Sequence, residues 1–133
     1  MKISTSLAVL VSAGLLAFGS VRAVQADEYG PLKTMATSAG NVLTSPTGMT
    51  LYTYDKDAQG ASDCYGECAE YWPPVKAEAT DKPAGDLTIV KRKDGSLQWA
   101  DGGKPLYTYV SDKKPGDVTG DNKNGVWHVV KEH

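Results

Sequence analysis

Cysteine and histidine are scarce, since the 133 residues include only two of each. Both cysteines lie in the stretch DCYGEC at 63–68, at a spacing that differs from thioredoxin-type redox motifs and from haem attachment sites. No serine, histidine or aspartate stands in the sequence context of a nucleophile elbow. These absences argue against catalysis and against a bound cofactor, so we expect a protein that is not an enzyme and has no cofactor.

Long apolar runs are missing too, apart from one near the start. Residues 7–18 form an apolar run that follows Lys2 and precedes small residues. A run of about a dozen residues is too short to cross a bilayer but is typical of a secretory signal peptide. We expect cleavage after Ala26, or alternatively after Ala23, which gives a signal peptide at 1–26 and an exported domain at 27–133. The predicted location is the periplasm or the exterior, with no transmembrane segment.

The exported chain also lacks an excess of positive charge. Without Lys2 and Arg22, 12 basic residues remain against 16 acidic ones, a formal charge of −4. Nucleic-acid binding needs a basic footprint, and the one cluster, KRK at 91–93, has Asp86 and Asp94 nearby. We expect this cluster to be a solvated strand end, and we do not expect nucleic acid as a partner.

What the sequence does contain is an internal repeat. A shift of 55 positions, without a gap, aligns residues 30–75 with residues 85–130, and eleven residues are identical in that register. The longest identity is LYTY, at 51–54 and again at 106–109. Units of this size are too small to bury their apolar faces alone. We therefore expect the two copies to form a single domain, sharing one core with pseudo-twofold symmetry.

Each unit shows the signals of short strands joined by tight turns. Alternating or β-branched segments are separated by turns such as AGN at 39–41 and DGS at 94–96. The short links imply antiparallel pairing, so the predicted fold class is mainly β, with two tandem antiparallel repeats. The expected strands are 32–38, 42–45, 49–54 and 72–75 in the first repeat and 87–93, 97–100, 104–109 and 127–130 in the second.

One segment of the first repeat departs from this pattern. The stretch SDCYGECAEYW predicts a short helix, with Ser62 or Asp63 as its N-cap and Pro73 at its end. On such a helix Cys64 and Cys68 share one face, and export favours a disulfide between them. A bridge over so short a loop would contribute about 2 kcal/mol and would mainly fix local shape.

The repeat places the same aromatic and acidic residues in both units. In a strand, Tyr52 and Tyr54 share one face, while Leu51 and Thr53 take the other. In a structural interpretation the rings supply apolar bulk and the aspartates accept hydrogen bonds in turns or from tyrosine hydroxyls. In a functional interpretation both sets line a symmetric groove for a polar ligand or a cation. The candidate binding surface comprises Tyr52, Tyr54, Asp57, Tyr107, Tyr109 and Asp112.

The spacing Tyr-x-Tyr-x-x-Asp, which starts at Tyr52 and again at Tyr107, resembles a secreted repeat family of predicted lipoproteins with a Yx(FWY)xxD motif. CYGEC and WPP after the first copy and GVWHVV after the second fit the same pattern over essentially the whole exported chain. The resemblance implies an envelope location and a two-repeat build, but no reaction, because the function of that family is unknown. Unlike a lipoprotein, this chain has no cysteine at the end of its predicted signal peptide to carry a lipid.

Two metal sites are alternatives. Cys64 and Cys68 could bind Cu(I) with His128 and either Met35 or Met49, since thiolates and thioethers suit this ion. Calcium is suggested by the loop DVTGDNKNG, although its spacing departs from the EF-hand and turn chemistry explains its composition equally well. The oxygen ligands in that loop would be Asp117, Asp121, Asn122 and Asn124.

These observations predict an exported cell-envelope protein that acts as a non-catalytic binding or structural module. Its partner would be an unidentified small molecule or envelope component. The alternative is a periplasmic copper-handling or redox protein that uses Cys64 and Cys68.

Overall fold

The computed structural model describes residues 29–133, and the predicted signal peptide lies outside this range. The described chain contains eight short β-strands, one α-helix, α2 (Glu67–Tyr71), and one 3-10 helix, η3 (Lys123–Gly125). All strand pairs are antiparallel. The predicted mainly β fold, with one short α-helix in the first repeat, is therefore confirmed.

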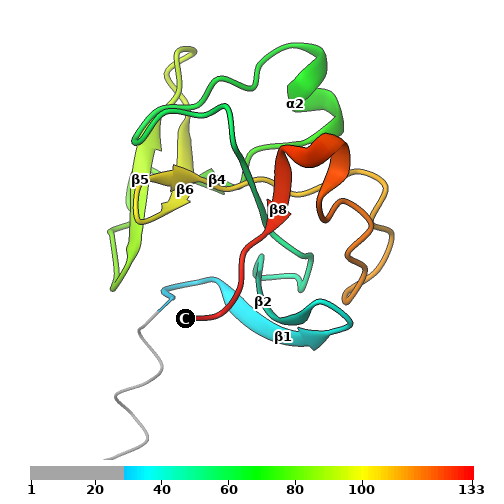
Figure 1. Cartoon of the computed structure of the whole chain (residues 1–133). Helices are drawn as coiled ribbons and strands as arrows, with labels where there is room; N and C mark the ends of the chain where they lie inside the picture. The colour runs from blue at the N-terminus through cyan, green and yellow to red at the C-terminus, as the bar shows by residue number, and fades with distance from the viewer. Residues whose placement is uncertain (1–28) are drawn as a thin grey trace, which may run out of the picture.

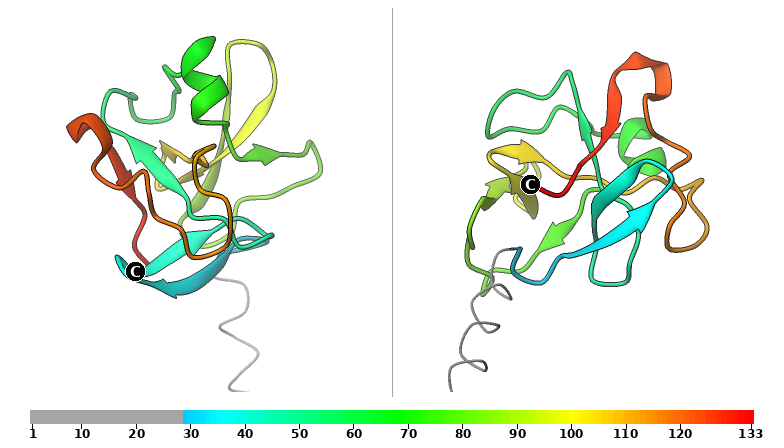
Figure 2. Two further views of the ribbon diagram at one scale, coloured as in Figure 1. Left: turned by 90° about the vertical axis from the view of Figure 1, so that its right-hand side faces the viewer. Right: turned by 60° about the horizontal axis from the view of Figure 1, so that its bottom comes forward.

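Each repeat begins with a β-hairpin. β1 (Lys33–Thr37) pairs with β2 (Gly40–Thr44), and β5 (Leu87–Lys91) pairs with β6 (Leu97–Asp101). The first hairpin lies at the end of the molecule opposite α2 (Figures 1 and 2). Both turns contain a glycine with positive φ, 102° at Gly40 and 93° at Gly95, a conformation that glycine adopts without strain.

The two hairpins differ by one residue in register. Met35 pairs with Val42, whereas Val90, which is 55 positions after Met35, pairs with Gln98. The second turn is thus one residue longer than an ungapped repeat predicts, and the next connection, from β6 to the second LYTY segment, is one residue shorter. The ungapped sequence alignment hides this pair of compensating changes.

The later strands pair across the repeats. β3 (Tyr52–Tyr54) of the first repeat pairs with β8 (Trp127–Val129) of the second. β4 (Lys76–Ala77), at the end of the first repeat, pairs with β6 of the second, which also pairs with β7 (Lys104–Pro105). Each repeat therefore sends its last strand to the other one, and Figure 1 shows β4 beside β6.

The buried residues form two clusters, and each cluster draws on both repeats. The alternation of side chains along the LYTY segments divides them, because Leu51 and Leu106 enter the larger cluster while Tyr52 and Tyr107 enter the smaller one. The pseudo-twofold relation of the repeats stays a prediction. The larger cluster consists of Leu32, Leu43, Leu51, Val75, Ala77, Leu87, Trp99, Leu106 and Val130. The smaller cluster consists of Tyr52, Cys64, Trp72, Tyr107 and Trp127.

Two predicted boundaries are wrong. The helix begins at Glu67, with Gly66 as its N-cap at a φ of 60°, and not after Ser62 or Asp63. The predicted strand at 72–75 contains two prolines that cannot donate to a ladder. It is reduced to an isolated bridge between Pro74 and Tyr107, and a strand, β4, begins only at Lys76. The end of the helix does agree with the sequence, because it closes at Tyr71, two residues before Pro73.

Candidate functional site

The two LYTY segments bring their first tyrosines together inside the molecule. The Tyr52 N–H donates to the Tyr107 carbonyl oxygen at 2.8 Å, and the Tyr107 N–H donates to the Tyr52 carbonyl oxygen at 3.0 Å. Both side chains are fully buried. We call Tyr52 and Tyr107 the inner tyrosines, and Tyr54 and Tyr109 the outer tyrosines. The inner pair belongs to the core.

Each inner tyrosine donates a hydrogen bond to the motif aspartate of the other repeat. The Tyr52 hydroxyl lies 2.7 Å from Asp112 Oδ2, and the Tyr107 hydroxyl lies 2.7 Å from Asp57 Oδ2. Burial, with a contribution from the carboxylates, raises the pKa of both tyrosines well above the usual range. The hydroxyls therefore remain protonated donors that tie the two repeats together.

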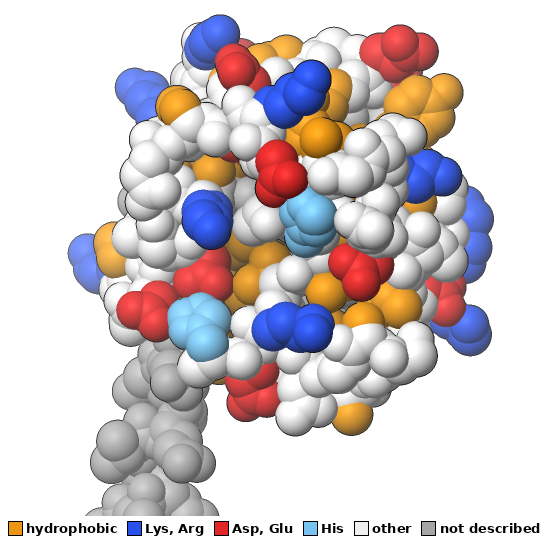
Figure 3. Space-filling model, in the orientation of Figure 1, with side chains coloured by type: hydrophobic (Ala, Val, Ile, Leu, Met, Phe, Trp, Pro, Cys, Tyr) orange, Lys and Arg blue, Asp and Glu red, His pale blue; other side chains and the backbone are white. Residues whose placement is uncertain are grey.

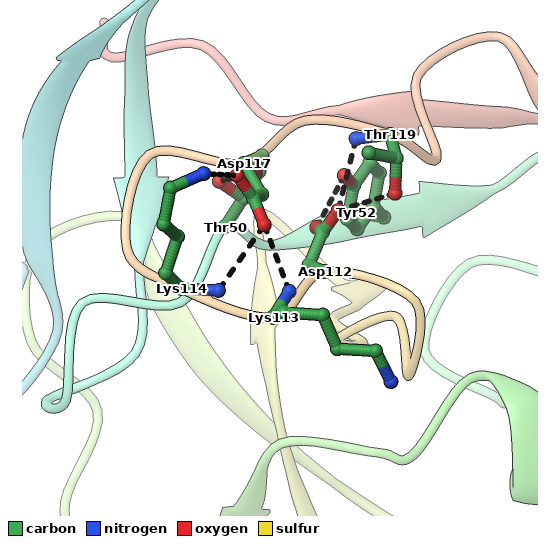
Figure 4. A network of polar contacts seen from close by, with 7 residues as sticks. All are labelled: Thr50, Tyr52, Asp112, Lys113, Lys114, Asp117 and Thr119. Carbon is green, nitrogen blue, oxygen red and sulfur yellow. Dashed lines mark hydrogen bonds and ion pairs between the residues drawn. The ribbon is translucent and has the colours of Figure 1, made fainter.

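Asp112 also orders the loop that follows it (Figure 4). Its Oδ1 accepts hydrogen bonds from the Thr119 N–H at 2.9 Å and the Thr119 hydroxyl at 2.6 Å. The Gly120 N–H donates to the Tyr52 hydroxyl oxygen at 3.1 Å. The Asp112 carboxylate and the Tyr52 hydroxyl thus fix the loop that contains Thr119 and Gly120, in the second repeat.

The loop residues considered as calcium ligands make contacts within the protein. Asp117 Oδ1 pairs with Lys114 Nζ at 2.6 Å, and this contact lowers the pKa of Asp117. Asp121 Oδ1 accepts a backbone N–H from β8 at 3.1 Å, and Asn122 and Asn124 adopt the positive φ values of turn residues. Within residues 29–133, no group of three or more His, Cys, Asp or Glu side chains is placed to hold a metal ion.

Asp57 forms a comparable network in the first repeat. Its Oδ1 accepts the Asp63 N–H at 2.7 Å, while its Oδ2 accepts the Tyr107 hydroxyl. That hydroxyl lies 2.6 Å from Ser62 Oγ, which in turn accepts a hydrogen bond from Arg92 Nη1 at 3.0 Å. Burial raises the pKa of Asp57 above its ordinary value, although the tyrosine and the backbone donor oppose the shift.

Arg92 corrects the prediction that 91–93 is a solvated cluster. Its side chain is buried, whereas Lys91 and Lys93 are exposed. Besides Ser62, the guanidinium donates to Gln98 Oε1 at 2.8 Å and to the Cys64 carbonyl oxygen at 2.7 Å. Successive side chains of a strand point to opposite faces, so Arg92 points inward, toward these acceptors, while Lys91 and Lys93 point outward. Arg92 therefore holds the segment before α2 in place.

Cys64 and Cys68 form the predicted disulfide, with their Cα atoms 5.3 Å apart. Cys64 is buried in the smaller cluster, and Cys68 is partly exposed on α2. While bridged, neither sulfur is a thiolate ligand for copper. The other candidate copper ligands point elsewhere, since His128 Nε2 lies 2.9 Å from Asp55 Oδ2 and Met35 packs beside Gly48.

Four aromatic rings from both repeats form one continuous stack over the inner tyrosines. We call this stack the aromatic column, and it runs in the order Tyr54, Trp127, Trp72, Tyr109. Neighbouring ring centroids are 4.2, 3.9 and 4.0 Å apart, with interplanar angles of 11°, 2° and 17°. The inner tyrosines pack edge-on against it, at 5.3 Å from Trp72 and 5.2 Å from Trp127. Both repeats thus contribute one tryptophan and one outer tyrosine.

All four rings of the aromatic column line a groove of about 500 Å³. One side is formed by Glu67, Cys68 and Tyr71 of α2, and the other by Lys123 and Asn124 of η3. The two helices lie at the same end of the molecule (Figure 1). Lys123 Nζ stands 6.0 Å from the Tyr109 ring centroid. The lining therefore combines five aromatic side chains with one acidic and one basic side chain.

A family model described as a secreted repeat of unknown function matches residues 33–76 and again residues 88–131. The chain belongs to this secreted-repeat family. The match confirms the resemblance and the tandem build that the sequence predicts. Searches of curated proteins and of solved structures found no match. Within residues 29–133, no helix of this family member has the length and apolarity needed to cross a membrane.

The secreted-repeat motif is divided between core and groove. The outer tyrosines line the groove, the inner tyrosines lie beneath it, and the motif aspartates bond the inner tyrosines without lining it. Asp57 lines a separate, smaller pocket of about 160 Å³. The structure thus separates residues that the sequence grouped as one candidate surface.

Sequence reasoning missed several groove residues. Trp72 and Trp127 carried a usable signal, because they are identical at the repeat spacing of 55 and aromatic at both positions. Tyr71 and Lys123 carried no such signal, because they lie in the segments in which the two repeats differ. The groove combines rings that the repeat contains twice with side chains from segments in which the repeats differ, so the sequence repeat alone does not reveal it.

Proposed function

We propose that this protein is a non-catalytic binding module of the cell envelope that holds a small molecule in the groove over the aromatic column. The observation that supports the proposal is the convergence of four stacked rings, one acid and one base on a single groove. Ligand sites are typically concave and mostly apolar, with a few polar groups that fix orientation. The lining of this groove has aromatic side chains together with Glu67 and Lys123 as polar groups.

The network beneath the groove favours binding over catalysis. Within residues 29–133, no buried side-chain nitrogen or oxygen lacks a hydrogen-bond partner. The inner tyrosines are held as protonated donors by burial, which makes their hydroxyls poor bases and poor nucleophiles. A floor fixed in this way keeps the rings in position before a ligand arrives, which reduces the entropy lost on binding.

Export is part of the proposal. A signal peptide at 1–26 would direct the chain out of the cytoplasm and leave a single domain at 27–133 in the periplasm or outside the cell. N-terminal sequencing of the mature protein is expected to begin at Asp27, or at Val24 for the alternative cut. A mature chain that still begins at Met1 would contradict it.

On the face drawn in Figure 3, acidic and basic side chains are interspersed, without a basic patch for nucleic acid.

Binding at the groove can be tested with a library of small aromatic and polar fragments, observed through backbone amide resonances. We expect the shifts to gather at residues 67–72 and 123–127, and to weaken in the Tyr71→Ala and Lys123→Ala variants. Both side chains are exposed, so neither change should disturb folding. Val110→Ala and Lys82→Ala are matched controls outside the groove. Shifts that avoid the groove, or that survive both groove variants, would refute the proposal.

A second candidate function is thiol–disulfide exchange, and one observation favours it. Cys68 is partly exposed and lines the groove, whereas Cys64 is buried. A thiolate that attacked Cys68 Sγ would form a mixed disulfide with it, break the bond between the two sulfurs and release Cys64 as a thiolate, which takes up a proton from water. Glutathione added to the intact protein should then increase the mass by one glutathione at Cys68. If the Cys64–Cys68 disulfide stays unmodified while a small disulfide added to the same sample exchanges with glutathione, the disulfide of the protein is structural.

A further inference from the structure

The two indole nitrogens of the aromatic column, like its two tyrosine hydroxyls, have no hydrogen-bond partner within the described residues. Trp72 and Trp127 are 6% and 3% exposed, yet their indole N–H groups donate to no atom within residues 29–133. Neither nitrogen is sealed from solvent, since no fully buried side-chain nitrogen in this range lacks a partner. A tryptophan buried to this extent normally finds an acceptor for its N–H. Both tryptophans line the groove, and we infer that these two donors are available to a ligand there.

The aromatic column also shows which shape its surface accepts. Its rings are stacked at spacings of 3.9 to 4.2 Å, and each tryptophan has a neighbouring ring on both faces. The stack ends at Tyr54 and Tyr109, which are half-buried and line the groove. A flat ring can extend the stack at an outer tyrosine, or lie with its face against the ring edges, and aromatic pairs favour both geometries.

We propose that the groove binds a planar aromatic molecule with ring carbonyl oxygens, of the quinone or flavin class. This inference rests on the proposed function, because it names the ligand of the same groove. The flat ring system packs against the aromatic column, and its carbonyl oxygens accept the indole N–H groups of Trp72 and Trp127. The Lys123 ammonium, at the edge of the groove, suits an acidic substituent on the same molecule.

Two other ligand classes fit the groove less well. A quaternary ammonium ion also binds aromatic surroundings, but it would compete with the Lys123 ammonium near Tyr109, and Glu67 is the single carboxylate lining the groove. A carbohydrate packs on open ring faces, and the tryptophan faces are already covered within the column. Neither class uses the stacking surface and the free indole donors together.

A matched pair of probes tests the inference on the intact mature protein. Anthraquinone-2-sulfonate and anthracene-2-sulfonate share the flat ring system and the charge, and they differ in the two ring carbonyls. We expect calorimetry to give a dissociation constant for the anthraquinone that is at least about three- to tenfold lower, since each neutral hydrogen bond provides a ratio of this size. Trp72→Phe and Trp127→Phe should reduce this ratio toward one, because phenylalanine keeps a ring and removes the donor. Tyr71→Phe, which keeps both indoles, should leave it unchanged.

Choline and N-acetylglucosamine serve as probes for the other ligand classes. Equal affinity for the two anthracene derivatives would overturn the inference. Groove binding by choline or by the sugar, with neither anthracene derivative bound, would overturn the ligand class and leave the proposed function standing. Failure of all four probes would overturn the inference as well. If a tryptophan variant does not fold, the ratio of affinities for the unaltered protein still decides the outcome.

Discussion

At the scale of single residues, the two tyrosines of each motif differ in what their hydroxyls do. The inner hydroxyls are saturated, since each donates to a carboxylate, and each is close to a further polar group. The hydroxyls of Tyr54 and Tyr109 have no hydrogen-bond partner within residues 29–133. The inner and outer tyrosines cannot be told apart in the sequence motif. Only their burial in the structure distinguishes the inner, structural tyrosine from the outer tyrosine at the groove.

Tyr52→Phe should destabilise the protein far more than Tyr54→Phe. The first change leaves Asp112 Oδ2 and the Gly120 N–H without the hydroxyl in a buried setting, at an expected cost of about 1–3 kcal/mol. The second removes a hydroxyl that bonds no described residue and should stay within about 0.5 kcal/mol. Denaturant unfolding of the two variants measures both values. Equal losses of unfolding free energy would contradict the division into inner and outer tyrosines.

Asp57 should give the unfolding free energy a recognisable pH dependence. Burial raises its pKa in the folded state above the ordinary 3.8, so the folded protein binds this proton more tightly than the unfolded chain does. Its contribution to stability is full below 3.8 and is lost as the pH rises through the raised pKa. The Asp57→Asn variant does not titrate there. The unfolding free energy of the unaltered protein, minus that of the variant, should fall with rising pH in this window. A flat or rising difference would be incompatible with the raised pKa.

At the scale of elements, the sequence predicts hairpins well and the helix start poorly. Alternation and turn glycines locate β1, β2, β5 and β6 to within two residues, because these signals are local. α2 starts after Gly66, which has a φ of 60°. The segment before it is held by the guanidinium of Arg92, which bonds Ser62 and the Cys64 carbonyl from about thirty positions away in the sequence. No pattern within 62–72 reveals that contact.

Arg92→Ala should therefore loosen the segment that carries the disulfide. The change removes three hydrogen bonds and leaves buried acceptors unpaired, with an expected loss of about 2–4 kcal/mol in unfolding free energy. Arg92→Lys should recover little, because an ammonium cannot reproduce the planar fork of the guanidinium. The exposed neighbour supplies the control, and Lys91→Ala should change stability by less than about 0.5 kcal/mol. A loss no larger than that of the control would show that Arg92 is dispensable.

At the scale of the whole molecule, the repeat is evident in the sequence, and the exchange of strands is not. Identities at a spacing of 55 establish two copies, and the family match confirms them. Pairing of β3 with β8 and of β4 with β6 joins segments far apart in the chain, and such pairing leaves no local pattern. The same holds for the groove, because the column meets α2 and η3 only after the repeats have docked.

The exchange predicts that neither repeat folds alone. Fragment 29–80 keeps the β1–β2 hairpin but lacks the partners of β3 and β4, and fragment 81–133 lacks the partner of β8. Each fragment holds only part of each buried cluster. Each fragment should give the circular dichroism of an unfolded chain, and mixing the two should restore a folded 1:1 complex. Cooperative unfolding by either isolated fragment would contradict the shared interior.

The central claim, that a ligand sits on the aromatic column, is tested most directly by the indole N–H resonances of the intact protein. The three tryptophans give three such signals, and Trp99 lies in the larger cluster, outside the groove, as an internal control. Titration with anthraquinone-2-sulfonate should shift the signals of Trp72 and Trp127 together, along one saturating curve, and leave Trp99 in place. A bound probe that shifts only Trp99, or that leaves both column tryptophans unmoved, would contradict the account.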